Sequence, residues 1–250
     1  MESNLRRFEF KAFATEEELA EVAGRRLAAR LAGAREASRF FTIALSGGRI
    51  ARRLYTVAAE DLRKRGGVGG QSHFFWADER CVPPEDRESN YLMAHELLLK
   101  PLEIATAQVH RIPGELDPAE AALRASTEFA GVMARHGVMP PRLELALLGM
   151  GEDGHIASLF PEEPAESTSD PAVFRAVVGP KPPPNRVTMG YSTLAAAREV
   201  WVIVSGSGKE IALRESISPG GNTPLARLLR MQSNAQVFSS VAVPTRQSTP

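Results

Sequence analysis

The chain has 250 residues, of which 43% are hydrophobic and 24% charged, with 30 Lys and Arg against 30 Asp and Glu. This composition is typical of a globular protein with one large α/β domain, and the zero net charge argues against a strongly basic nucleic-acid binder. The single cysteine, Cys81, excludes an intrachain disulfide and a thiolate metal cluster.

Helical and strand patterns alternate along the chain. A helix is expected over 15–32, because Thr15 followed by Glu18 forms a capping-box signature ahead of an amphipathic run. The next predicted elements are a strand, a helix, a strand and a helix, at Phe40–Leu45, 50–65, Ser72–Trp76 and 89–100, the last with Ser89 as its cap.

The second half continues the alternation. The predicted elements are a helix over Pro118–His136 with Asp117 as its cap, strands at Leu143–Leu148, Phe174–Val178, Arg186–Met189 and Glu199–Ser205, a helix over Lys209–Ile217 and a late strand at Ala235–Phe238. Residues 161–171 and 179–185 are expected to be loops.

Strands that alternate with helices predict an α/β fold, with a doubly wound, largely parallel sheet and helices on both faces, as in Rossmann-like proteins. We expect residues 1–240 to form a single domain and 241–250 to be a tail. Ligands of open α/β sheets bind beyond the carboxyl ends of strands, so the loops that follow Leu45, Trp76, Leu148 and Val178 are the candidate site.

Two of these loops carry polar residues directly after an apolar strand. Ser46-Gly47-Gly48-Arg49 is either a nest of backbone N–H groups for a phosphate or a tight turn that glycine makes without strain. Asp78, Glu79 and Arg80 follow the next strand and are either a ligand site or a solvated loop with a local ion pair.

The segment 149–161, GMGEDGHIASLFP, follows the buried run Leu145–Leu148. Asp153 and His155 are two residues apart, so the carboxylate is placed to orient the imidazole or to raise its basicity. A histidine near its reference pKa of about 6.5 is a suitable general base. The alternative is a histidine that is hydrogen-bonded within a turn for structural reasons.

Two later loops display cations. The proline-rich segment 179–186 carries Lys181 and Arg186, and Ser205–Lys209 follows a strong strand with the sequence SGSGK, which is not a Walker motif. The remaining histidines have no evident chemical role: His95 lies in a helical pattern, His136 is near a helix C-terminus, and His73 and His110 have no partner that the sequence indicates. No metal-binding motif is present, so we expect no metal and no cofactor.

In this order, the motifs LSGGR, WADERCVP with SN at 89–90, GMGEDGHIASLFP, PKPPPNR and GSGK resemble those of 6-phosphogluconolactonase, the hydrolase of the pentose phosphate pathway. The resemblance spans about residues 10–230. A related enzyme, glucosamine-6-phosphate deaminase, shares the DGH turn but has DEY where this chain has DER. Ile156 is deaminase-like, whereas Arg80 and Ser158–Pro161 match the lactonase.

The resemblance implies hydrolysis of 6-phospho-D-glucono-1,5-lactone by a cytoplasmic enzyme, without metal or cofactor. His155 would deprotonate the attacking water and Asp153 would hold its imidazole, while Arg80, Lys181 or backbone N–H groups would stabilise the oxyanion. The implied substrate-binding and phosphate-binding residues are Ser46, Gly47, Gly48, Arg49, Asp78, Gly151, Arg186 and Lys209. The expected partner is a small-molecule phosphosugar lactone, not a nucleic acid or a membrane, and we expect a monomer or at most a weak dimer.

One departure keeps two alternatives open. The family usually continues SGG with Ser-Thr-Pro, whereas this chain has Arg49-Ile50-Ala51, which removes two hydroxyl donors and adds a cation. The alternatives are a lactonase-like hydrolase with altered sugar specificity and a non-catalytic sugar-phosphate binding protein.

Overall fold

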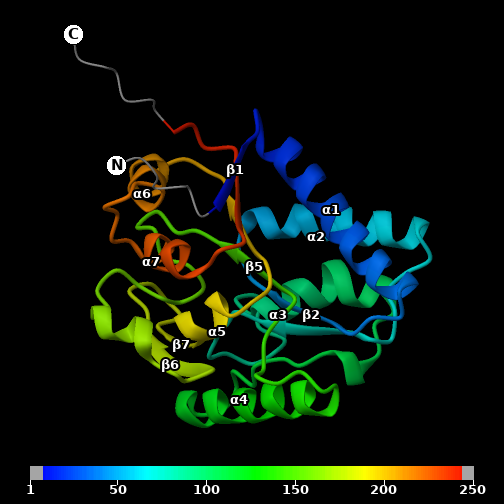
Figure 1. Ribbon diagram of the computed structural model, residues 1–250. Helices are drawn as coiled ribbons and strands as arrows, with labels where there is room; N and C mark the ends of the chain where they lie inside the picture. The colour runs from blue at the N-terminus through cyan, green and yellow to red at the C-terminus, as the bar shows by residue number, and fades with distance from the viewer. Residues whose placement is uncertain (1–7, 244–250) are drawn as a thin grey trace.

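The computed structural model describes residues 8–243, so the last seven residues of the predicted tail lie outside the described chain. Six strands form a fully parallel sheet in the order β1-β9-β8-β5-β2-β3 (Figure 1). Their bounds are β1 Phe8–Ala12, β2 Phe41–Leu45, β3 Ser72–Trp76, β5 Leu145–Gly149, β8 Val200–Val204 and β9 Ala235–Ser239.

The predicted strands of this sheet are confirmed to within two residues at each end. Every residue of β2, β3, β8 and β9 is buried, and most of their side chains are apolar, as expected for strands that are covered on both faces. β1, at the edge of the sheet, has no fully buried residue in its sequence FEFKA, and it was not predicted as a strand.

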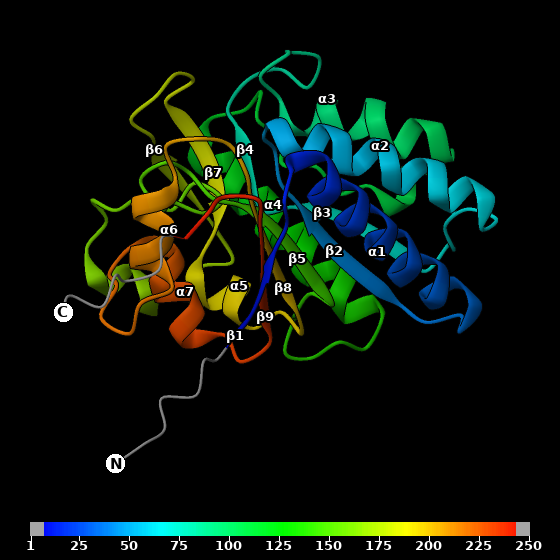
Figure 2. The ribbon, with the colours of Figure 1, turned by 90° about the horizontal axis from the view of Figure 1, so that it is seen from above.

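Helices cover both faces of the sheet, as the α/β prediction required. Figure 2 shows α1, α2 and α3 on one side and α5, α6 and α7 on the other. Their bounds are α1 Glu16–Glu36, α2 Arg49–Lys64, α3 Asn90–Ala94, α4 Pro118–Arg135, α5 Tyr191–Ala195, α6 Glu210–Ser216 and α7 Pro224–Met231. The helices α5 and α7 were not predicted from the sequence. Within residues 8–243, no helix has the length and apolar character needed to cross a membrane.

The predicted helix caps are confirmed. Thr15 Oγ1 accepts a hydrogen bond from Glu18 N, although Glu18 reaches back to Ala14 N rather than to the N–H of the cap itself. Ser89 Oγ accepts from Leu92 N, and Asp117 accepts from two N–H groups of α4. The helix predicted over 89–100 changes character at His95, where a π-helical turn, His95–Leu99, replaces the α-helix.

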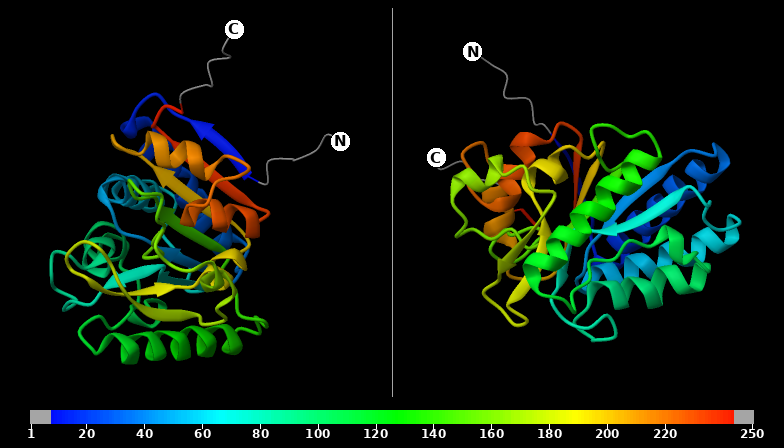
Figure 3. Two further views of the ribbon diagram at one scale, coloured as in Figure 1. Left: turned by 90° about the vertical axis from the view of Figure 1, so that its left-hand side faces the viewer. Right: turned by 90° about the horizontal axis from the view of Figure 1, so that it is seen from below.

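Three strands form a second, antiparallel sheet that the sequence analysis did not anticipate. Its order is β4-β7-β6, with β4 Asp78–Arg80, β6 Phe174–Val178 and β7 Asn185–Met189. Two predictions are therefore corrected: Asp78–Arg80 is a strand and not a loop, and the loop after Val178 does not lie at the edge of the main sheet. Both views in Figure 3 show this small sheet beside α4. The ring of Phe174 in β6 packs against the ring of Phe129 in α4.

Candidate active site

A cleft of about 380 Å³ opens where β2, β5 and β8 end. The chain leaves β2 toward β3 and leaves β5 toward β8, so the strand order reverses between β2 and β5. This is the crevice in which open α/β sheets bind ligands. Ten of the twelve predicted site residues line it: Ser46, Gly47, Gly48, Arg49, Asp78, Arg80, Gly151, His155, Arg186 and Lys209.

Asp153 and His155 form a hydrogen-bonded pair at this cleft. Asp153 Oδ1 lies 2.6 Å from His155 Nδ1 and also accepts from the backbone N–H of His155. Burial alone would raise the pKa of Asp153, but the hydrogen bonds from His155 outweigh it and lower the pKa to about 2. The carboxylate therefore holds the proton on Nδ1, which leaves Nε2 as the basic nitrogen.

The turn that carries this pair requires its glycines. A Cβ atom on Gly151 would fall 2.1 Å from His155 Nδ1, and Gly154 has a φ of +81°. Gly151 N donates to His155 O at 2.8 Å, which closes the turn around the imidazole. Ala157, a non-glycine residue with a φ of +48°, also lines the cleft. The turn is built to hold one orientation of His155.

The glycine turn after β2 presents free donors. The hydroxyl of Tyr55 binds both the N–H and the carbonyl of Ser46, so this backbone is fixed, while the buried Ser46 Oγ has no partner among the described residues. Gly48, with a φ of +107°, begins α2 without any side-chain cap. The first-turn N–H groups of α2 are therefore available to an anion in the cleft.

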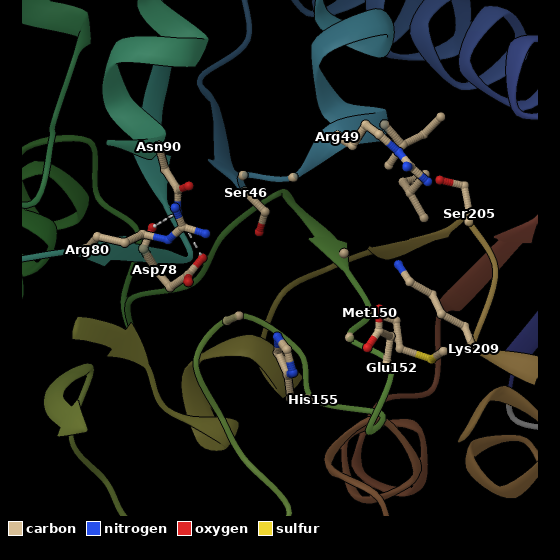
Figure 4. Close-up of a pocket in the computed structure, with 18 of the residues that line it drawn as sticks. Ser46, Arg49, Asp78, Arg80, Asn90, Met150, Glu152, His155, Ser205 and Lys209 are labelled. Atoms are coloured by element: carbon tan, nitrogen blue, oxygen red, sulfur yellow. Dashed lines mark hydrogen bonds between the residues drawn. The ribbon is translucent and has the colours of Figure 1, made fainter. Parts of the chain in front are cut away.

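The cations of the cleft form two groups, and Figure 4 shows His155 between them. Arg186 is buried, and its pKa is lowered by burial and by nearby Arg80, against the opposing effect of Asp78. On the other side, burial and Arg49 lower the pKa of Lys209, opposed by Glu152 and Glu16. Arg186 and Lys209 were both expected among the substrate-binding and phosphate-binding residues, but they belong to different groups.

Two predicted residues do not line the cleft. Asp153 lies behind His155, as a supporting carboxylate should. Lys181 is 77% exposed, and its Nζ lies 3.7 Å from a carboxylate oxygen of Glu152, whose backbone turn borders the cleft. Lys181 therefore lies at the rim, paired with a carboxylate.

The structure adds residues that the sequence analysis did not assign. Asn90 lines the cleft and donates from Nδ2 to the Asp78 carbonyl at 2.9 Å. Ser158 is fully buried and donates to Asp78 Oδ2. Ile156, the deaminase-like position, is also fully buried and pairs with Met150 and Leu159, so it faces the core and not the ligand. The motif SN at 89–90 was the available signal for Asn90.

The two histidines without an evident partner contact each other. His73 Nδ1 lies 2.8 Å from His110 Nε2, and His110 Nδ1 lies 2.8 Å from Glu128 Oε1. His73 is the second residue of β3, at the end of the strand opposite the cleft. This chain of groups is therefore separate from the candidate site.

Comparisons of the sequence and the fold with known proteins point to one family. Residues 14–238 match the family of glucosamine-6-phosphate isomerases/6-phosphogluconolactonase. A 6-phosphogluconolactonase of Mycobacterium tuberculosis is 40% identical over 161 residues, which is 62% of this chain and 63% of that protein. One of Mycobacterium leprae is 35% identical over 176 residues, 68% of this chain and 71% of that protein.

The match to the Mycobacterium tuberculosis protein thus spans less than two thirds of its length. Among solved structures, 6-phosphogluconolactonase from Trypanosoma cruzi superposes with a TM-score of 0.78 at 26% identity, over 92% of this chain and 93% of that one. The Trypanosoma brucei enzyme gives 0.75 at 28% identity, over 92% and 95%. The family match over residues 14–238 covers most of the chain, and it shows that the chain belongs to the glucosamine-6-phosphate isomerase/6-phosphogluconolactonase family.

Proposed function

We propose that the chain hydrolyses 6-phospho-D-glucono-1,5-lactone to 6-phosphogluconate, a reaction of the pentose phosphate pathway, and that it acts as a cytoplasmic monomer without a metal. The observation that carries the proposal is His155, which is hydrogen-bonded to Asp153 and lines a cleft together with four cations. Relatives at 35–40% identity are named 6-phosphogluconolactonase, which supports the same reaction class.

In the proposed mechanism, His155 Nε2 takes a proton from water as its oxygen bonds to the lactone carbonyl carbon. Negative charge develops on the carbonyl oxygen of the lactone. The backbone N–H groups of the turn that carries Gly151 and Gly154, or the side chain of Arg80 or Lys181, stabilise this charge. When the bond to the ring oxygen breaks, the imidazolium returns its proton to that oxygen, which becomes a hydroxyl. Asp153 stabilises the imidazolium between these two steps.

The proposed phosphate site is the Gly47–Gly48 turn, with its uncapped helix start. This turn lies between the two groups of cations: Gly47 packs on Asn90 beside Asp78 and Arg80, and Arg49 lies over Gly206, close to Lys209. Arg186 and Lys209 can therefore neutralise the phosphate from opposite sides. Asp78, Ser46 and Gly151 complete the substrate-facing wall.

A hydrolase with altered sugar specificity is the second candidate, because Arg49 projects from the turn and is 77% exposed. The two candidates are distinguished by the rates at which the protein hydrolyses freshly prepared 6-phosphogluconolactone and unphosphorylated gluconolactone, each corrected for spontaneous ring opening. We expect a clear preference for the phosphorylated lactone, and a fall toward the spontaneous rate in His155→Ala. Preference for the unphosphorylated lactone would favour the second candidate, and no hydrolysis of either would leave a binding protein.

A further inference from the structure

Glu79 lies between two cleft residues but is not itself part of the cleft. Asp78 and Arg80 line the cavity, and the strand alternation of β4 turns Glu79 the other way. Its side chain is buried, with 2% of the residue exposed, and no cation pairs with it among the described residues. A buried, unpaired carboxylate is costly unless hydrogen bonds replace its hydration.

Four donors surround this carboxylate. Oε1 accepts from Arg80 N at 2.8 Å and from Asn90 N at 2.7 Å. Oε2 accepts from Tyr91 N at 2.7 Å and from Ser89 Oγ at 3.1 Å. The acceptor capacity of an ionised carboxylate is thus fully used, and three of the donors are backbone groups, whose positions the carboxylate fixes.

The fixed segment reaches the substrate-facing wall through Asn90. Its amide donates to the Asp78 carbonyl, and a Cβ atom on Gly47 would fall 1.9 Å from Asn90 Oδ1. The Asn90 side chain is therefore wedged between β4 and the glycine turn after β2. A shift of the Asn90 backbone would displace both the proposed phosphate turn and the segment that carries Arg80.

We infer that Glu79 is a positioning residue, whose ionised carboxylate holds Asn90 and Arg80 in place and so keeps the Gly47 turn and the cationic wall of the cleft in register. The kinetic side of this inference rests on the proposed lactonase activity.

Protonation of Glu79 should give the wild-type protein a pH dependence that a merely structural role would not produce. Burial raises the pKa of Glu79 to about 7, opposed by the N–H groups of Asn90, Tyr91 and Arg80 and assisted by the nearby Asp78 carboxylate. A proton on either oxygen would oppose one of the four donors. Wild-type protein below pH 7 should therefore begin to resemble a variant with a neutral isostere at this position.

The experiment compares Glu79→Gln with a matched control, Glu199→Gln. Glu199 is also a buried carboxylate, bound by Trp201 Nε1 and Gln236 Nε2 at 2.7 Å and paired in addition with Arg26 and Arg30. It precedes β8, at the amino ends of the strands and away from the cleft. At pH 8 we expect E79Q to lose roughly 10- to 100-fold in kcat/KM, while E199Q stays within about twofold of wild type even if its stability falls.

The ratio of wild-type to E79Q kcat/KM should be smaller at pH 5.5 than at pH 8, because Glu79 is largely protonated in the wild type at pH 5.5 and then resembles the glutamine of the variant. The inference is overturned if E79Q has the kcat/KM of wild type at pH 8, or if the ratio of wild-type to E79Q kcat/KM is the same at both pH values. Either result leaves the lactonase proposal intact. If wild type itself fails to hydrolyse the lactone, the proposed function is wrong. The positioning role of Glu79 is then tested by amide hydrogen exchange at Asn90 and Tyr91. Faster exchange of these amides in E79Q supports the role, and unchanged exchange overturns it.

Should E79Q not fold, the same exchange measurement is made on wild type at pH 5.5 and pH 8, corrected for intrinsic exchange rates. Lower protection of Asn90 and Tyr91 at pH 5.5 supports the inference, and equal protection overturns it.

Discussion

Ser158 Oγ donates a hydrogen bond to Asp78 Oδ2 across 2.8 Å, between two buried side chains that are 80 residues apart in the sequence. Ser158 lies three residues after His155, and Asp78 lies two before Arg80. The bond therefore joins the turn that carries the proposed base to the strand that carries the cationic wall.

Ser158→Ala should lower the free energy of unfolding by about 1–3 kcal/mol, because it leaves a buried carboxylate oxygen without this donor. We also expect kcat/KM to fall, since Asp78 lines the cleft. Urea denaturation and lactone kinetics test both. Ser192→Ala is the control: it removes a hydroxyl that donates to Asp170 O, away from the cleft. Equal stability and activity for the two variants would contradict the proposed link.

Gly151→Ala should reduce kcat by about 100-fold, because the new methyl group would occupy the position of the His155 ring and displace it. Gly33→Ala is the matched control, since a Cβ atom at this position in α1 meets no atom within 4 Å. The control should stabilise the protein by about 0.5–1 kcal/mol and leave the rate unchanged. A Gly151 variant with normal kcat would show that the turn tolerates another orientation of the imidazole.

His73 should make the protein less stable in acid. Burial is the main cause that lowers its pKa to about 4, with His110 and His136 next. The unfolded chain titrates near pH 6.5, so between pH 6.5 and 4 the unfolded state binds more protons and stability falls as the pH falls. Denaturant unfolding of wild type and His73→Phe at pH 7 and pH 4.5 should show a steeper loss in wild type. Parallel losses would refute the assignment.

Much of the fold could be predicted because local signals and tertiary packing agree. The strands β2, β5 and β8 are mainly apolar runs of the length that a doubly covered sheet buries. Thr15, Ser89 and Asp117 cap helices as their side-chain chemistry favours. The glycine turns also had to lie at the carboxyl edge of the sheet, which brought His155 and the Gly47–Gly48 turn into one cleft.

What could not be predicted depends on pairing between distant segments. Asp78–Arg80 becomes a strand only because Asn185–Met189 lies alongside it, more than a hundred residues later. That pairing also moves Arg186 next to Arg80 and away from Lys209. The edge strand β1 has no continuous apolar run, and Lys181 reaches the rim through a loop whose course its composition does not specify.

The parallel pairing of β1 with β9 has a consequence for synthesis. Phe8 is in register with Ala235, so β1 finds its partner only when more than two hundred further residues have been made. Until then β1 has no strand to pair with, because β9 is its one neighbour in the described sheet, and completion of this sheet waits for a contact that is distant in the sequence. The order of translation thus makes the joining of the two ends of the described chain a late event in folding.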